Sequence, residues 1–418
     1  MVDDAKTINS KDIFQNEENN DTELLIKNND KELLRNLIGF WLLGLCNNFG
    51  YVVMLSAAYD ILQEQTHTNT TKSYSTDGFH CNPISTGAVL LADIIPSLII
   101  NWTAPFYINR FSYPLRVAVV IILLTASFLT VSFSTSRFLS LLGVVFASIS
   151  SGAGEITFLS LSVHFKKTTV STWSSGTGMA GVCGSLSYAF LRQIGLSSHD
   201  TLLVLLVVPA LFAFTFWIVL KFPYDIKTKN EYMSHDKQPG CFDKTKQMSF
   251  IAKVRLIKPL IKYMVPLFLV YLAEYTINQG LFELLYYKIW LSQASQYRWF
   301  QVDYQIGVFI SRSSVNLFQI KKVIFPALCQ WLVLLFLLLE VYYVFIPSFW
   351  ITLIVILFEG LLGGTVYVNT FYLIFQEVEE DYREFSMSMA NVANINGITI
   401  AGFLALPIHN FLCEQKRL

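Results

Sequence analysis

The sequence predicts an all-α protein that crosses a membrane about eleven times, and two observations support this fold class. First, 53% of the 418 residues are hydrophobic and only 14% are charged, whereas ordinary soluble domains contain about 25% charged residues. Second, the chain contains eleven apolar segments, most of them close to the length of about 20 residues that a helix needs to cross a bilayer. Together these features exclude an ordinary soluble domain and predict a polytopic membrane protein.

A long hydrophilic stretch divides the eleven segments into six and five. We therefore expect a disordered cytosolic tail (1–36), a six-helix bundle (37–222), a cytosolic loop (223–259) and a five-helix bundle (260–418). The tail is rich in Asn, Asp, Glu and Lys, a composition typical of disorder. The predicted spans are Leu37–Leu62, Ile84–Tyr107, Leu115–Phe133, Phe138–Val163, Trp173–Ile194, Thr201–Phe222, Leu260–Ile289, Phe300–Val315, Val323–Ile346, Phe349–Phe375 and Phe385–Leu412. The eighth is short and polar, so it gives the weakest signal.

The distribution of Lys and Arg predicts the orientation, because these residues collect in cytosolic loops. A cytosolic N-terminus places most loop cations, including those of 223–259, in the cytosol, and an odd number of spans places the C-terminus on the far side. The far-side loop after the first span contains an N-glycosylation sequon at Asn69. Cys81 and Cys413 share that side, where they form a disulfide or remain two free thiols.

The two halves of the chain show a weak internal repeat. A shift of 212 residues aligns Phe146–Phe158 with Phe358–Thr370, and the same shift places Trp173 on Phe385. In both halves, a Gly-rich helix precedes a second helix rich in small and polar residues. This pattern favours two bundles related as parallel pseudo-repeats, as in the major-facilitator fold, with the final helix missing.

Val265–Ile289 is the stretch around which the chain is organised. It is apolar and long enough to span, yet it contains Glu274, Asn278, Gln279 and Glu283. An ionisable group at membrane depth costs about 2.5–3.5 kcal/mol on insertion scales. Residues four apart share one helical face, so this side of the helix is expected to line a cavity or to face partner helices rather than lipid.

Other spans also contain carboxylates. Glu155, Glu274 and Glu359 are candidates for proton coupling or gating, because buried carboxylates can take up and release protons. Asp93 lies near mid-span beside Pro96, where it has either a structural role, as an ion pair or cap, or a functional one.

Arg312, in the eighth segment, is the cation at membrane depth that most suggests a ligand. Its planar guanidinium suits phosphate or carboxylate. Alternatively, Arg312 forms an ion pair with Glu155, Glu274 or Glu359, or extends to the cytosolic face. The polar residues that we select as candidate substrate-binding groups are Arg312, Asn47, Asn48, Asn278, Gln279 and Ser175.

We find no nucleophile–base set, nucleotide-binding loop or metal-ligand spacing in the sequence. The chain is therefore not expected to be an enzyme, and no cofactor, metal or nucleic-acid partner is predicted.

Several long motifs identify a resemblance. The first span, Phe40–Leu62, and the segments Gly143–Leu161, Ala273–Leu285, Gln296–Ser314 and Glu359–Phe371 resemble the battenin family over essentially all of the membrane region. The resemblance implies a major-facilitator-like protein of lysosomal and late endosomal membranes. It also implies a role in the clearance of glycerophosphodiesters, the products of phospholipid breakdown, with links to lysosomal pH and basic amino acids. Glu274 and Arg312 match positions at which the family is sensitive to change.

The resulting hypothesis is a lysosomal exporter of glycerophosphodiesters in contact with membrane lipid. The alternatives are a basic amino acid carrier and a non-transporting scaffold that regulates trafficking and pH. In the tail, Asp21, Leu25 and Ile26 match an acidic dileucine pattern. This pattern either binds sorting adaptors or only opens a helix.

Overall fold

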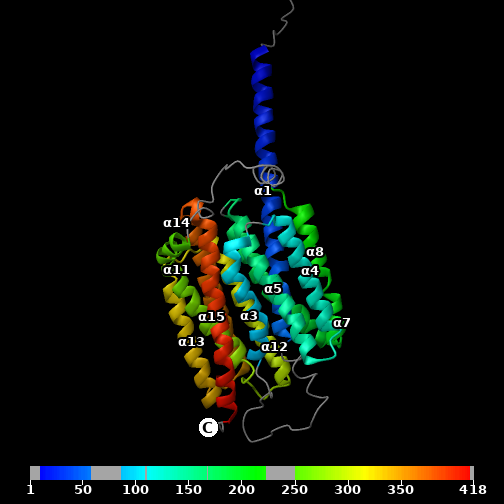
Figure 1. The fold of residues 1–418 in the computed structure, drawn as a ribbon, viewed down its shortest axis with the longest axis vertical. Coiled ribbons are helices and arrows are strands. Elements are labelled where there is room, and N and C mark those ends of the chain that lie inside the picture. The colour runs from blue at the N-terminus through cyan, green and yellow to red at the C-terminus, as the bar shows by residue number, and fades with distance from the viewer. Residues whose placement is uncertain (1–9, 58–85, 109–110, 167, 223–249, 415–418) are drawn as a thin grey trace, which may run out of the picture.

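The computed structural model describes residues 10–57, 86–108, 111–166, 168–222 and 250–414, and within these ranges it contains helices and no strands. The helices run roughly parallel to one long axis (Figure 1). α1 extends beyond the bundle at one end, and the C-terminus lies at the other. Apolar side chains pack between the helices, and many other large apolar side chains face outward. This distribution is the one expected of a protein surrounded by lipid.

Six of the predicted spans form the first half of the bundle. Its elements are α1 (Ser10–Ser56), α3 (Gly87–Tyr107), α4 (Tyr113–Ser132), α5 (Arg137–Ser162), α6 (Thr168–Gln193), and the consecutive α7 (Ser198–Val204), α8 (Val207–Phe214) and π-helix η2 (Thr215–Val219). The second half consists of α11 (Phe250–Thr276) with π-helix η3 (Ile277–Leu281), α12 (Gln293–Ser313) with the short η4 (Ser314–Asn316), α13 (Ile324–Tyr343), α14 (Phe349–Glu377) and α15 (Glu380–Glu414).

Each of the eleven predicted segments coincides with a helix or a run of helices, so the all-α membrane fold class is confirmed. Among the described residues, nine helical stretches are long and apolar enough to cross a membrane. The other two, α6 and α12, have 26 and 21 residues, sufficient length at 1.5 Å per residue. They are more polar, and they pack extensively against each other, α6 also against α1 and α12 also against α14.

Three boundaries differ from the sequence-based expectations. α1 begins at Ser10, inside the segment 1–36 that was expected to be disordered, because extending an existing helix needs no new nucleus. α11 begins at Phe250, inside the expected loop 223–259, and continues through Pro259. At the other end, η3 stops at Leu281, so Glu283 lies beyond the helix and not on its polar stripe as predicted.

Each half packs mainly on itself, and the two halves meet along two helix pairs. α6 lies against α12, and α3 lies against α15. Small residues allow the close approach at the first pair: a Cβ on Gly178 would lie 3.0 Å from the Cα of Phe309. Within the first half, a Cβ on Gly176 would lie 2.1 Å from the carbonyl oxygen of Trp41. The Gly-rich α6 therefore serves packing first, as small residues in membrane helices commonly do.

The predicted repeat has a counterpart at the centre of the molecule. The 212-residue shift pairs Glu155 of α5 with Tyr367 of α14, and the Tyr367 hydroxyl donates a hydrogen bond to the Glu155 carboxylate. Equivalent residues of two related halves can touch only near the axis that relates them. This contact is the one expected of the predicted repeat, and it brings α5 and α14 together at Glu155 and Tyr367.

Candidate functional site: a central polar cavity

A cavity lies between the two halves, with an empty volume of about 610 Å³ that includes space open to solvent. Its walls come from α1, α3 and α5 of the first half and from α11, α12, α14 and α15 of the second. The lining residues with polar side chains are Asn48, Tyr51, Asp93, Ser97, Ser148, Ser151, Glu155, Tyr271, Tyr275, Arg312, Tyr367, Asn391 and Asn394. A space at membrane depth with this many polar groups is suited to a polar solute.

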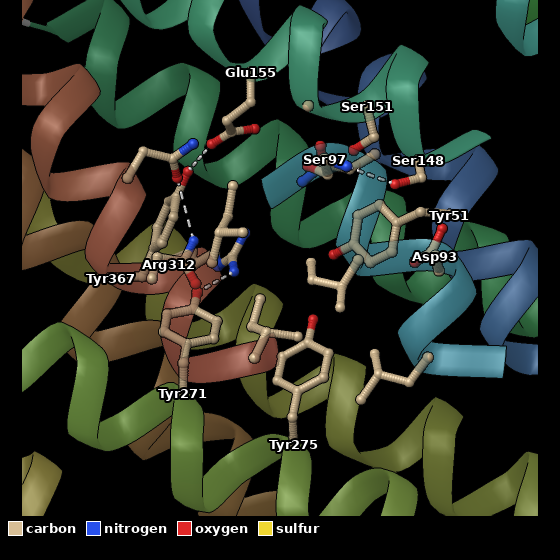
Figure 2. A pocket seen from close by; sticks show the side chains of 18 residues that line it. Tyr51, Asp93, Ser97, Ser148, Ser151, Glu155, Tyr271, Tyr275, Arg312 and Tyr367 are labelled. Carbon is tan, nitrogen blue, oxygen red and sulfur yellow. Dashed lines mark hydrogen bonds between the residues drawn. The ribbon is translucent and has the colours of Figure 1, made fainter. Parts of the chain in front are cut away.

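Arg312 lies in the wall of this cavity and joins the two halves (Figure 2). One terminal nitrogen donates to Thr177 Oγ1 of α6 at 2.8 Å, and the other donates to the Tyr271 hydroxyl of α11 at 2.9 Å. The guanidinium carbon lies 4.0 Å from the centre of the Tyr367 ring, in cation–π geometry. These neutral partners orient the guanidinium without neutralising its charge.

Arg312 therefore retains binding capacity. Its Nε has no hydrogen-bond partner, and only 6% of the residue is exposed. Within the described ranges, no carboxylate forms an ion pair with it. The structure therefore does not show the predicted alternative, an ion pair between Arg312 and Glu155, Glu274 or Glu359. A buried, oriented cation without an anionic partner is suited to an anionic ligand.

Of the three candidate carboxylates, Glu155 alone lines the cavity. It accepts the hydrogen bond from Tyr367, whose ring also lies against Arg312. Because Glu155 belongs to the first half and Tyr367 to the second, this bond must break or shift if the halves move apart.

Glu274 lies behind the cavity wall, between α11, α12 and α14. Its carboxylate accepts a hydrogen bond from the Tyr304 hydroxyl of α12, and its Oε2 has no partner. The backbone of α14 comes so close that a Cβ on Gly363 would lie 1.9 Å from Oε2. The π-turn at η3 inserts a residue into the helix after Glu274. Asn278 lies within this π-turn and does not line the cavity.

Glu359 does not line the cavity. It is fully buried on α14, where Gln330 of α13 donates a hydrogen bond of 3.4 Å to its Oε1. Its other oxygen, Oε2, has no partner.

The predicted substrate-binding residues of the first half separate into two groups. Asn48 lines the cavity. Asn47 donates to Asn48 Oδ1 at 3.0 Å and to the Ser151 carbonyl at 3.2 Å, and its oxygen packs against Gly154. Ser175 lies at the α6–α12 contact, where its hydroxyl is 2.9 Å from that of Ser313. Asn48 thus lines the same cavity as Arg312, whereas Asn47 and Ser175 lie in contacts between helices.

Gln279 belongs to a second buried polar group around η3, which we call the η3 cluster (Thr86, Gln279, Glu283, Tyr297 and His409). Thr86 donates through its hydroxyl to the Gln279 carbonyl at 3.1 Å and through its backbone N–H to Glu283 at 3.3 Å. Tyr297 donates to the Gln279 side chain at 3.2 Å, and His409 lies 3.0 Å from Glu283. Asn278 lies beside the cluster, where its backbone carbonyl accepts from Gln301. None of these side chains lines the cavity.

The remaining predictions concern segments away from the cavity. The sequon at Asn69 lies outside the described residues. Asp21, Leu25 and Ile26 fall within α1. Cys413 is disulfide-bonded, while Cys81 lies outside the described residues, so their predicted pairing stays a prediction.

The main cavity residues that the sequence reasoning missed are tyrosines. Tyr51, Tyr271, Tyr275 and Tyr367 all line the cavity. The sequence reasoning weighted charged and amide groups and gave these tyrosines no binding role. Tyr271 and Tyr275 lie four residues apart on the same helix as Glu274. This spacing was the signal in the sequence that would have identified a polar face directed inward.

The comparisons with known proteins identify the family. The model of the CLN3 protein family matches residues 38–415. The chain is 47% identical to battenin of Canis lupus familiaris over 403 residues, which cover 91% of this chain and 92% of battenin. The chain belongs to the CLN3 protein family. Another CLN3-family relative, Protein BTN1 of Yarrowia lipolytica, is 37% identical over 90% of this chain and 94% of its own length. The resemblance predicted from the sequence motifs is confirmed.

Solved structures support the same fold for this CLN3-family chain. A D-xylose-proton symporter superposes with a TM-score of 0.60 and 13% identity, over 92% of this chain and 98% of its own. A bacterial homologue of the human lysosomal transporter Spinster, inward-facing and unoccupied, gives a TM-score of 0.54 and 13% identity, over 88% and 80% of the two chains. The predicted major-facilitator-like arrangement is confirmed.

Proposed function

We propose that this protein is a lysosomal or vacuolar membrane transporter that exports glycerophosphodiesters. The observation that carries the proposal is Arg312: a buried, oriented guanidinium in the wall of a central cavity, without a carboxylate partner in the described part of the chain. A phosphodiester is a permanent anion whose oxygens accept the hydrogen bonds that a guanidinium donates. Asn48 and Ser151 supply further polar groups for the glycerol hydroxyls.

The mechanism that we propose is alternating access. The two halves meet at α6–α12 and α3–α15, and two interactions join them across the cavity: Arg312 with Thr177, and Tyr367 with Glu155. A phosphodiester bound to Arg312 competes with Thr177 for the guanidinium. Protonation of Glu155 removes the charge to which Tyr367 donates. Both events weaken the links between the halves, which connects substrate and proton binding to opening.

Support also comes from the similar proteins. The Spinster homologue is described as related to a lysosomal transporter and the xylose protein as a proton symporter. A lysosomal location, a cytosolic N-terminus and sorting through Asp21, Leu25 and Ile26 are part of this proposal. The proposal also includes Glu274 and Glu359 as further proton acceptors, located behind the cavity wall.

The direct test is uptake of labelled glycerophosphocholine into proteoliposomes that contain the purified protein, with and without a pH gradient. We expect saturable uptake that is faster with the gradient. Empty liposomes control for leakage. Correctly folded and oriented protein that gives no uptake under either condition would refute direct transport and favour a regulator of trafficking and pH.

A second candidate function is a basic amino acid carrier. It is favoured by the two carboxylates in the cavity, Asp93 and Glu155. Uptake of labelled arginine in the same liposomes, with unlabelled glycerophosphocholine as competitor, separates the two candidates. Transport of arginine without competition by glycerophosphocholine would favour the amino acid carrier.

A further inference from the structure

Asp93 is a second unpaired charge in the cavity. It lies on α3, is 4% exposed and lines the same space as Arg312. Its Oδ1 has no hydrogen-bond partner. Among the described residues, Asp93 forms neither the ion pair nor the cap considered from the sequence.

Asp93 and Arg312 do not neutralise each other. No ion pair joins them, and Figure 2 shows them on opposite sides of the cavity. At this depth an unpaired carboxylate or guanidinium is costly, so a pair of opposite charges held apart requires an explanation. A ligand with an anionic group at one end and a cationic group at the other would satisfy both.

Two tyrosine side chains lie in the cavity between Asp93 and Arg312. Tyr51 of α1 and Tyr275 of α11 line the cavity between Asp93 and Arg312, and both side chains point into it in Figure 2. The faces of aromatic rings attract ammonium groups, and quaternary ammonium ligands are commonly bound in this way. A carboxylate with adjacent tyrosines is therefore a suitable site for a cation.

Glu155 is not an equivalent cation site. Its carboxylate accepts a hydrogen bond from Tyr367, whose ring lies against the Arg312 guanidinium. Glu155 therefore lies at the same end of the cavity as the positive charge of Arg312. Asp93 is the carboxylate at the other end.

We propose that Asp93, Tyr51 and Tyr275 form a head-group subsite for the ammonium group of a zwitterionic substrate whose phosphodiester is held by Arg312. This inference rests on the proposed function and sharpens it. The preferred glycerophosphodiesters carry choline or ethanolamine, whereas those with an uncharged head group, such as glycerol or inositol, leave Asp93 unpaired.

The test combines a change in the ligand with a change in the protein. Uptake of glycerophosphocholine is compared with uptake of its neutral analogue, in which a carbon atom replaces the quaternary nitrogen. Shape and apolar area are then nearly equal, so a difference reports the charge. For the wild type, we expect the half-saturating concentration of the neutral analogue to be about tenfold higher, the scale of a desolvated cation–π contact and ion pair.

Asp93→Asn should remove that difference, so that the two ligands become nearly equal, while uptake of glycerophosphoglycerol stays within about twofold of wild type. Asp303→Asn, which changes a half-buried carboxylate of α12 outside the cavity, is the matched control and should keep the tenfold preference. If Asp93→Asn does not fold, the two ligands still decide the question with the wild type alone.

Equal use of the two ligands by the wild type would overturn the subsite. So would a loss in Asp93→Asn that is the same for all three compounds, because such a loss indicates proton coupling or packing instead. Wild-type protein that moves none of the glycerophosphodiesters would refute the proposed function, and the subsite with it. That outcome is distinct from transport without head-group preference, which refutes the subsite alone.

Discussion

Two polar regions are buried between the helices, and they differ in how their hydrogen bonds are used. In the η3 cluster, Gln279 is hydrogen-bonded to Thr86 and to Tyr297. Glu283 accepts a hydrogen bond from the backbone N–H of Thr86 and lies beside His409. In the central cavity, the Nε of Arg312 and the Oδ1 of Asp93 are buried without a hydrogen-bond partner, and both residues line the cavity.

This difference distinguishes a hydrogen-bonded polar cluster from a cavity whose lining includes unpartnered polar atoms. Buried polar groups are normally hydrogen-bonded, because an unpaired one costs about 1–3 kcal/mol. A cluster whose groups satisfy one another stabilises the arrangement of its helices. Unsatisfied charged groups in a cavity wall add this cost without stabilising the fold, which supports the proposal that the cavity binds substrate.

The largest expected effect is on Arg312. Arg312→Gln removes the charge that holds the phosphodiester, and loss of one partner from a buried charged pair costs about 2–5 kcal/mol. We therefore expect glycerophosphocholine uptake to fall about 100-fold, measured as initial rate per correctly folded molecule. Arg298→Gln, on the same helix but outside the cavity, is the control and should transport within about twofold of wild type. Equal rates for the two variants would remove Arg312 from the site.

A smaller effect is expected at Gly363, which tests the position of Glu274. A Cβ at Gly363 would lie 1.9 Å from Glu274 Oε2, so in Gly363→Ala this carboxylate must move. Because only the end of a side chain is displaced, the fold should survive. Uptake should fall about tenfold, which corresponds to the loss of one interaction of about 1.4 kcal/mol.

Gly280→Ala is the matched control for this substitution. The nearest atoms to its new Cβ would be those of Ala405 at 3.4 Å, an ordinary contact. Its uptake should equal that of the wild type. If Gly363→Ala also transports normally, the position of Glu274 has no part in transport.

Glu155→Gln should have a more selective effect. The amide keeps a group that accepts from Tyr367 but can no longer take up a proton. We expect uptake without a gradient to remain within about threefold of wild type, while the acceleration by a pH gradient is lost. The measurement is the ratio of initial rates with and without the gradient. An unchanged ratio would exclude Glu155 as the coupling group and leave Glu274 to be tested in the same way.

The smallest effect on transport is expected in the η3 cluster. Glu283→Gln disturbs a bonded network, so the free energy of unfolding should fall by about 1–3 kcal/mol. This loss is measured as a lower melting temperature in detergent. The half-saturating concentration of glycerophosphocholine should stay within about twofold of the wild-type value. A loss of affinity without a loss of stability would show that this cluster, too, binds substrate.

The sequence predicted the fold class because hydrophobic length and family motifs are local signals. It also identified Arg312, Asn48 and Glu155, since each interrupts an apolar helix. It could not place Asn278 and Gln279, because their hydrogen-bond partners Thr86, Tyr297 and Gln301 come from other segments of the chain. The predicted role of Asp93 was left open, because whether a carboxylate has a partner depends on helices distant in the sequence. The cavity tyrosines resembled ordinary aromatic residues of a membrane span.

The measurement that tests the central claim most directly is binding of glycerophosphocholine to the purified protein by titration calorimetry, for the wild type, Arg312→Gln and Glu283→Gln. We predict that the wild type and Glu283→Gln bind with similar affinity and that Arg312→Gln shows no measurable binding. Binding that persists in Arg312→Gln and disappears in a folded Glu283→Gln would contradict the account and move the substrate site from the cavity to the η3 cluster.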